Sequence, residues 1–174
     1  SFFMKKADRF ICVSNYIRDV HIANGFDSNK MQTIYNFMPE PSSVSKRISK
    51  HLIEIFNKYQ FIVLYAGKLS LGKGADIMIG TAQEIIKKRN DVLFVFAGVI
   101  NYPINLVRDK QLFFLNSVEY SSLLAIMKLA DLICIPSVWP EPLSRVIIEA
   151  FSLGKPVLAS NRGGSKELVN EQTK

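Results

Sequence analysis

The sequence has few of the residues that usually mark disulfide or metal chemistry. Its 174 residues include two cysteines and two histidines. Cys12 and Cys134 each lie in an apolar run, FICVS and DLICIPS, where a cysteine is usually a small core residue. We therefore expect two reduced, buried thiols and a cytoplasmic protein, because disulfides are typical of oxidising compartments. His21 and His51 have no ligand residues nearby and no Asp-x-Asp pair occurs, so we expect no metal site.

Long apolar runs and long basic blocks are also missing. No run reaches the roughly 18 apolar residues that are typical of a membrane span. Lys and Arg outnumber Asp and Glu by 22 to 15, which gives a formal charge of +7. The basic residues are scattered and are not interleaved with aromatic ones, so we expect no nucleic-acid binding. The charge therefore indicates either a solvated basic face or attraction to an anion, such as a nucleotide or the anionic inner face of a membrane.

Strand-like runs alternate with helix-like stretches along the chain. Strands are expected at 10–13, 31–35, 61–66, 92–97, 111–115, 131–136 and 156–159. Four of them (IVLYA, VLFVFA, LFFL, LICI) are apolar at nearly every position, which is typical of parallel strands covered on both faces. Helices are expected at 15–24, 75–89, 120–129, 144–153 and 165–170. The sequence therefore predicts an α/β fold with a Rossmann-like, doubly wound parallel sheet.

One segment interrupts the alternation. Residues 38–50, MPEPSSVSKRISK, are rich in Pro and Ser and show little periodicity, which is typical of a linker. We expect the residues before it to belong to a different sheet from those after it. The sequence is therefore divided into residues 1–39 and residues 40–174.

The first candidate site is a glycine- and lysine-rich loop. Residues 67–74, GKLSLGKG, follow a predicted buried strand and precede a predicted helix. The glycines allow close approach of the backbone to a ligand, and Lys68 and Lys73 flank the turn. Amides and ammonium groups at a helix start bind anions well. The spacing differs from a Walker loop because Gly74 follows Lys73, and a loop with two solvated lysines stays open as an alternative.

The second candidate is a proline-rich loop that leads into a helix, residues 136–150, PSVWPEPLSRVIIEA. Glu141 lies in the loop, and Glu149 lies about one and a half turns into the helix, in the apolar stretch VIIEAF. A carboxylate in such a stretch is costly without a partner. Glu149 is therefore either a surface residue on the outer helix face or a ligand for a diol, as acidic residues are for ribose in dinucleotide-binding folds.

The third candidate is the loop at residues 161–167, NRGGSKE, which joins a predicted strand to a helix. Its two adjacent glycines permit close approach of a ligand at a helix start. All three candidates follow strands of one predicted parallel sheet, and open α/β sheets bind ligands at the carboxyl ends of their strands.

These stretches resemble the C-terminal, donor-binding domain of family 4 retaining glycosyltransferases with the GT-B fold. The matching pieces are AGKLSLGKG, VFAG, FFLNSV and ADLICIPSVWPEPLSRVIIEAFSLGKPVLASNRGGSKELV. The most specific is the Glu141-x7-Glu149 pair, with PS before it and GKPV after it. Upstream, ADRFICVSNYIRDVHIANGF and IYNFMP resemble the last strand–helix–strand of the family's N-terminal, acceptor-side domain.

The resemblance implies a role for each matching residue. Lys68 and Lys73 match the basic residues that hold the donor diphosphate, Glu149 matches the residue that binds the ribose, and Glu141 matches the one that contacts the donor sugar. Glu141, Lys68 and Lys73 form the implied catalytic set. The remaining donor-binding positions are Gly67 and Gly98 in the nucleotide cleft, Ser117 and Val118 at the base, and the helix-start residues Leu143, Ser144 and Arg145.

Three departures from the family pattern leave the donor preference open. Lys68 replaces a commoner arginine, so a bidentate phosphate contact becomes a point charge. Ser144 replaces a glycine and adds a Cβ near the sugar. Residues 99–100, Val-Ile, replace a glycine-bearing turn.

The implied reaction transfers a sugar of the hexose type from a nucleoside diphosphate, such as UDP or GDP, to an unknown acceptor with retention of configuration, in glycan biosynthesis. Lys68, Lys73 and the helix-start amides would stabilise the leaving diphosphate, so neither a metal nor a cofactor is expected. We expect Glu141 to orient the sugar and not to act as a nucleophile.

The resemblance further implies that most of the acceptor-side domain and the end of the donor domain are not in this sequence. We therefore expect donor binding without turnover unless the N-terminal domain or an acceptor subunit is supplied. Two alternatives stay open. One is a non-catalytic donor-binding subunit that needs a separate acceptor subunit, and the other is a nucleotide-binding regulatory module.

Overall fold

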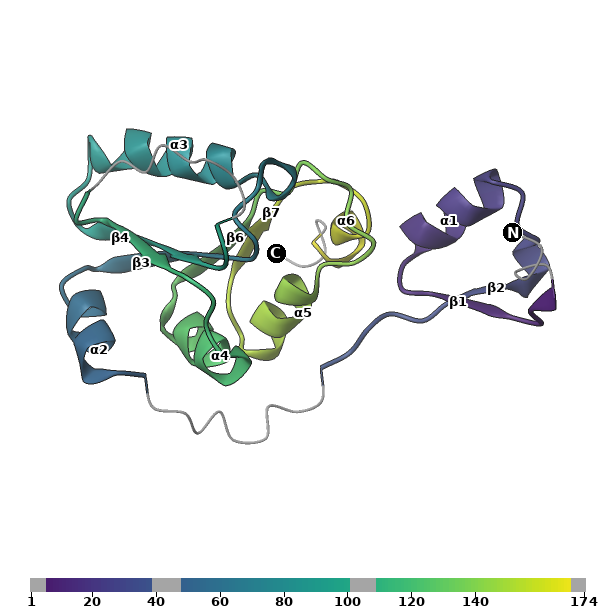
Figure 1. Ribbon diagram of the computed structural model, residues 1–174, viewed down its shortest axis with the longest axis horizontal. Helices are drawn as coiled ribbons and strands as arrows, with labels where there is room; N and C mark the ends of the chain where they lie inside the picture. The colour runs from purple at the N-terminus through teal and green to yellow at the C-terminus, as the bar shows by residue number, and fades with distance from the viewer. Residues whose placement is uncertain (1–5, 39–47, 101–108, 170–174) are drawn as a thin grey trace.

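The computed structural model describes residues 6–38, 48–100 and 109–169 of the chain (Figure 1). Its first part is a small two-stranded sheet with one helix. β1 (Phe10–Cys12) pairs in parallel with β2 (Met31–Thr33), and α1 (Asn15–Ala23) connects them, followed by a short 3-10 turn at Ser28–Lys30. The Ser14 side chain caps α1 by accepting a hydrogen bond from the Ile17 amide, as the sequence predicts for a helix that begins after Ser14.

The second part is a five-stranded parallel sheet with the strand order β5-β4-β3-β6-β7. The chain places β4 and then β5 on one side of β3, and it places β6 and then β7 on the other side. Open α/β sheets bind ligands beside the strand at which the direction of strand addition changes in this way. The strands are β3 (Phe61–Ala66), β4 (Val92–Ala97), β5 (Leu112–Leu115), β6 (Leu132–Ile135) and β7 (Val157–Ala159). The helices are α2 (Lys50–Phe56), α3 (Ala75–Ile86), α4 (Tyr120–Leu129), α5 (Arg145–Ser152) and α6 (Ser165–Leu168), with a 3-10 turn at Leu71–Lys73.

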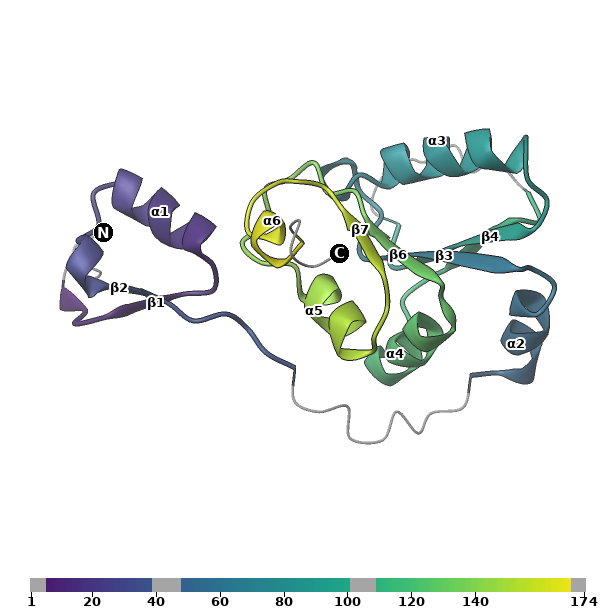
Figure 2. The same ribbon diagram turned by 180° about the vertical axis from the view of Figure 1, so that it is seen from behind.

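Helices cover both faces of this sheet, so its central strands are buried on both sides. Figures 1 and 2 show α3 on one face and α2, α4 and α5 on the other. Alternate residues of β3 enter different cores: Leu64 joins the core under α4 and α5, and Tyr65 joins the core under α3. All six residues of β4 are buried, which explains why its sequence is apolar throughout.

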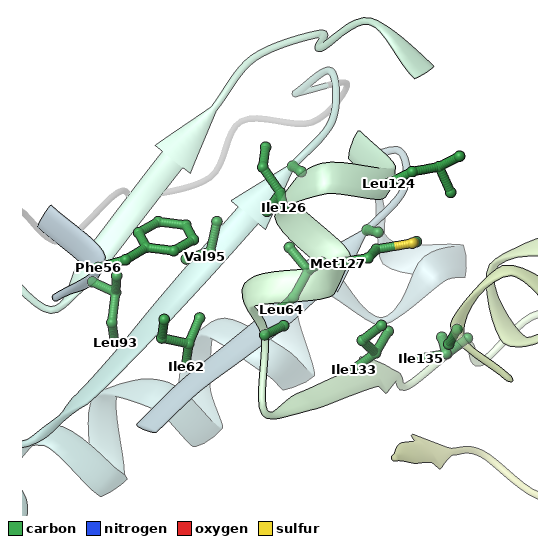
Figure 3. Close-up of a cluster of buried hydrophobic side chains, with 14 of the residues drawn as sticks. Phe56, Ile62, Leu64, Leu93, Val95, Leu124, Ile126, Met127, Ile133 and Ile135 are labelled. Atoms are coloured by element: carbon green, nitrogen blue, oxygen red, sulfur yellow. The ribbon is translucent and has the colours of Figure 1, made fainter. Parts of the chain in front are cut away.

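The larger core lies between the sheet and α4. Figure 3 shows Leu124, Ile126 and Met127 of α4 over side chains from neighbouring strands, with Phe56 of α2 at one end. Met127 and Leu64 are fully buried at 0% exposure. This layer fixes α4 and the sheet relative to each other, and with them the loops that follow each strand.

The observed elements confirm the predicted α/β fold with a parallel sheet. All seven predicted strands form, and Cys12 and Cys134 are buried and free. The helix predicted at 75–89 ends earlier, at Ile86, and α2 was not predicted because it directly follows the Pro- and Ser-rich segment. The predicted boundary between residues 39 and 40 lies outside the described residues. No helix in the part of the chain that the structure describes is long and apolar enough to cross a membrane.

Candidate functional site

The predicted site residues follow the carboxyl ends of adjacent strands. Gly67 follows β3, Gly98 follows β4, Ser117 and Val118 come soon after β5, and Ser137 follows β6. The strands are parallel, so these loops gather at one edge of the sheet. This is the edge at which open α/β sheets bind ligands.

A pocket of about 160 Å³ opens at this edge. It contains four of the predicted site residues, from two loops that are more than 60 positions apart in the sequence. Apolar groups from β3, β6 and α5 complete the walls. The lining residues are Tyr65, Ala66, Gly67, Lys68, Lys73, Cys134, Ile135, Ser137, Glu141 and Val146.

Lys73 and Glu141 form an ion pair inside this pocket. The Lys73 Nζ lies 3.0 Å from the Glu141 Oε2, with the lysine side chain 39% exposed and the glutamate side chain 12% exposed. The Ser137 hydroxyl donates a hydrogen bond to the other oxygen, Glu141 Oε1. Both carboxylate oxygens are therefore held, and the lysine remains accessible to a ligand from the open side.

Tyr65 holds the backbone of the lysine loop. Its side chain is 2% exposed, and its hydroxyl donates to the carbonyl oxygens of Lys68, at 2.9 Å, and Lys73, at 3.3 Å. Burial, followed by the negative charges of Glu141 and Asp76, raises the pKa of Tyr65, so the hydroxyl stays protonated and remains a donor. One buried side chain thus binds the backbone carbonyl groups of both predicted phosphate-binding lysines.

Two glycines let the loops pack closer than any other residue would allow. Gly74 has a φ of 68°, and a Cβ there would lie 2.0 Å from the Pro136 carbonyl oxygen. A Cβ on Gly98 would lie 1.9 Å from the Gly67 carbonyl oxygen. The loops after β3, β4 and β6 therefore meet backbone to backbone, and this close approach shapes the pocket.

Glu149 lies on α5 with its side chain turned into the protein. It is 4% exposed, its Oε1 accepts a hydrogen bond of 3.1 Å from the Tyr120 hydroxyl, and Arg145 Nη2 lies 3.6 Å away. Burial raises the pKa of Glu149, and the Tyr120 hydroxyl and Arg145 lower it by a smaller amount. The outer-face alternative is therefore wrong: Glu149 is a buried, partnered carboxylate.

The structure places Glu149 next to the pocket without making it part of the walls. Val146 lines the pocket, and residues three apart on a helix are neighbours, so Glu149 lies one turn further along the same helix side. Of the other predicted residues that the structure describes, Gly98, Ser117, Val118, Leu143, Ser144 and Arg145 also lie outside the pocket walls. Leu143 and Ser144 are buried at the start of α5, Arg145 is exposed, and Ser117 and Val118 lie between β5 and α4.

The third candidate loop is already filled by protein. A Cβ on Gly163 would lie 2.4 Å from the Glu141 carbonyl oxygen, and one on Gly164 would lie 2.0 Å from the Pro142 carbonyl oxygen. The Gly164 amide donates to the Glu141 carbonyl at 2.8 Å. The expectation that these glycines admit a ligand is therefore wrong, because they admit the backbone of the loop that carries Glu141.

Three residues of the site were missed by sequence reasoning. Tyr65, Ser137 and Tyr120 each contribute a hydroxyl that holds a predicted residue or its backbone. A tyrosine inside a buried strand is a usable signal, because its hydroxyl needs a partner there. Within residues 6–38, 48–100 and 109–169, no three His, Cys, Asp or Glu side chains gather in a way that could hold a metal ion.

The sequence matches a known protein family along most of its length. Residues 47–174 match the family described as Glycosyl transferases group 1. The chain is 29% identical to spore coat protein SA of Bacillus subtilis over 94% of its own length and 49% of that protein. It is 34% identical to an uncharacterized 42.6 kDa protein in the cps region of Klebsiella pneumoniae, over 94% of its own length and 41% of that protein.

The fold matches solved structures of GT-B glycosyltransferases. The Anabaena protein HepE, crystallised in complex with UDP-glucose, superposes with a TM-score of 0.75 and 26% identity, over 95% of this chain and 48% of HepE. The chain therefore spans about half the length of the relatives and structures that it matches.

Proposed function

Since the chain belongs to the Glycosyl transferases group 1 family, we propose that it forms the nucleotide-sugar site of a retaining, metal-independent glycosyltransferase of family 4. The reaction transfers the sugar of a nucleoside diphosphate to an acceptor. The observation that carries the proposal is the pocket that Gly67, Lys68, Lys73 and Glu141 line together at the carboxyl edge of a parallel sheet.

The two lysines are assigned to the diphosphate. They line one pocket, and Tyr65 fixes the carbonyl groups of both residues. As the bond to the sugar breaks, negative charge grows on the diphosphate, so cations held beside it stabilise the transition state more than the ground state. This charge stabilisation is the work that a metal ion would otherwise do.

The two glutamates are assigned to the two ends of the donor. Glu141 is held by Ser137 and Lys73, which leaves it positioned to accept hydrogen bonds from sugar hydroxyls and to orient the sugar. Glu149, one turn beyond Val146 on α5, accepts from the ribose diol. A buried carboxylate is costly, and a diol that donates two hydrogen bonds is a partner that offsets this cost.

UDP-sugars are the donors we favour. HepE, which is 26% identical and shares the fold over 95% of this chain, was crystallised in complex with UDP-glucose. We further propose that residues 40–174 form the donor domain and that residues 1–39 end an acceptor-side domain. The rest of that domain, or a separate acceptor subunit, would supply the acceptor and be required for turnover.

Isothermal titration calorimetry of the chain with UDP, UDP-glucose and GDP tests the proposal. Lys68→Ala and Lys73→Ala should each weaken UDP binding by about tenfold or more, the worth of one charge-assisted hydrogen bond. Lys88→Ala is the matched control, because Lys88 is exposed and follows α3 at the opposite edge of the sheet. The proposal fails if the pocket variants bind UDP as tightly as the control. Transfer by the isolated chain would show that no further acceptor-side part is needed.

A further inference from the structure

A hydrogen bond joins the N-terminal segment (residues 10–35) to the loop that carries Glu141. Ser14 is fully buried, and its hydroxyl donates to the Pro142 carbonyl at 2.5 Å while it accepts from the Ile17 amide. Pro142 directly follows Glu141 in the loop at residues 140–144, here named the donor loop. The cap of α1 is therefore attached to the backbone next to a proposed sugar-binding residue.

Glu167 of α6 also contacts the N-terminal segment. The contacts of Glu167 and those of Ser14 are together named the junction. Its Oε2 accepts from the Asn15 amide at 2.9 Å, and its Oε1 accepts from the Tyr16 amide at 2.7 Å. The first amides of a helix have no acceptor within the helix, and a negative charge near them is favourable. The first turn of α1, which the structure describes in full, has no acidic residue of its own, so Glu167 supplies that charge from 151 residues beyond Tyr16.

Tyr35, at the end of the N-terminal segment, also contacts Glu167. Its hydroxyl donates to Glu167 Oε2 at 2.6 Å and accepts from the Asn15 side-chain amide at 2.8 Å. Figures 1 and 2 show the start of α1 facing α6. Glu167 therefore contacts both the start of α1 and the last residue of the N-terminal segment.

The helix that carries Glu167 is itself fixed to the donor loop. Gly163 and Gly164, directly before α6, pack against the carbonyl groups of Glu141 and Pro142, and the Gly164 amide donates to the Glu141 carbonyl. The N-terminal segment is thus connected to the backbone of the donor loop by two routes, through Ser14 and through Glu167.

We propose that Glu167 is a positioning residue that couples docking of the N-terminal segment to donor binding, so that each favours the other. The inference rests on the proposed function, because it takes the pocket as the donor site. In the docked arrangement the donor loop already holds Glu141 beside Lys73. When the loop already has this position, donor binding costs less conformational entropy, because the loop does not have to be ordered. The donor therefore binds more tightly. The coupling is reciprocal by thermodynamic linkage, so the donor must also strengthen docking.

The test measures both directions of the coupling in the 174-residue chain. NMR hydrogen exchange at the Asn15 and Tyr16 amides reports docking directly, because Glu167 is their acceptor. Saturating UDP should slow exchange at these two amides by about fivefold or more, and Glu167→Gln should raise the Kd for UDP by a similar factor. A glutamine presents one oxygen and one NH2 group, so it has an acceptor at only one of the two positions that Oε1 and Oε2 of Glu167 occupy.

Two further variants make the outcome specific. Glu54→Gln is the matched control, because Glu54 is exposed on α2 and the chemical change is the same. Tyr35→Phe removes one donor to Glu167 and should shift both readouts in the same direction by a smaller amount, which decides the question if Glu167→Gln does not fold.

The possible results separate the two proposals. If UDP binds but exchange at Asn15 and Tyr16 does not respond to it, or if Glu167→Gln binds UDP as the control does, Glu167 has only a structural role and the coupling is overturned. If the unmodified chain binds none of the nucleotides, the proposed function itself fails, and the coupling fails with it.

Discussion

The ammonium group of Lys73 lies 3.0 Å from a carboxylate oxygen of Glu141. The family resemblance implies that the lysine holds the diphosphate and that the glutamate contacts the sugar, but it does not imply that the two side chains touch. In a nucleotide sugar the sugar is bonded directly to the terminal phosphate, so groups that hold these two parts must be neighbours. The ion pair therefore agrees with the proposal that Lys73 and Glu141 meet the same donor.

Removing the charge of Glu141 should separate phosphate binding from sugar binding. In Glu141→Gln, Lys73 loses its ion-pair partner and becomes more available to phosphate, so the Kd for UDP should fall by about two- to fivefold. UDP-glucose should lose its sugar contact, so its affinity relative to UDP should decrease. Calorimetry with both ligands measures this, with Glu54→Gln as control. Equal weakening of UDP and UDP-glucose would contradict a sugar-specific role, as would full turnover of the variant in the complete transferase.

Glu149→Gln should weaken nucleotide binding while leaving the fold intact. The side-chain oxygen can still accept from Tyr120, but the charged acceptor for the ribose is lost, so the Kd for UDP should rise by about tenfold. The free nucleoside uridine should show the same loss, because the ribose and not the diphosphate is affected. Loss of UDP affinity with unchanged uridine affinity would rule out the ribose assignment.

The pH dependence of stability should change in the same variant. Burial raises the pKa of the Glu149 carboxyl in the folded protein. Its contribution to stability is therefore complete below the unfolded pKa and is lost as pH rises through the folded pKa. Glutamine does not titrate, so the Tm of Glu149→Gln relative to the unmodified protein should increase as pH rises from about 4, near the ordinary pKa of glutamate, through the raised pKa of the folded state. A constant Tm difference over this range would contradict the shift.

Gly74→Ala should damage both stability and the pocket. The alanine would need a φ of 68°, and its Cβ would meet the Pro136 carbonyl oxygen at 2.0 Å. The expected loss is about 1–3 kcal/mol, with weaker UDP binding because the loop of Lys73 must move. Gly80→Ala is the control: it lies inside α3 with open space around it and should stabilise the protein by about 0.5–1 kcal/mol. Urea unfolding of both variants checks this, and equal effects would contradict the close packing.

Tyr65→Phe should loosen the lysine loop. The change leaves the carbonyl groups of Lys68 and Lys73 without their shared donor, at an expected cost of about 1–3 kcal/mol and with a measurable loss of UDP affinity. Tyr59→Phe also removes a hydroxyl that donates to a carbonyl, that of Lys110, but at a more exposed position after α2. It should leave UDP affinity unchanged. If Tyr65→Phe binds UDP as tightly as Tyr59→Phe, the hydroxyl does not position the lysines.

The elements of the fold could be predicted where burial dictates the sequence. β4 reads VLFVFA because helices cover both of its faces, and α1 begins after Ser14 because that side chain caps it. α2 was missed for the opposite reason: its seven residues are too few for a clear helical period, and a Pro- and Ser-rich segment precedes them.

The site could be predicted only in part, because spacing gives residue types and not their partners. Lys68, Lys73 and Glu141 were found from their loops, and the structure brings all three into one pocket. The hydroxyl groups of Ser137 and Tyr120 depend on contacts between separate elements, which periodicity does not reveal. The prediction that Gly163 lies close to a ligand was wrong. A glycine permits close approach of any group, and here that group is the Glu141 carbonyl.

The partners of Glu167 also bear on how the chain is made. The Asn15 amide finds its acceptor 152 residues later in the sequence, and the Ser14 hydroxyl finds Pro142 after 128. During synthesis, α1 leaves the ribosome long before either partner exists, and contacts between such distant residues are slow to form. The opening turn of α1 therefore cannot be capped by Glu167 until the ribosome has added 151 residues after Tyr16.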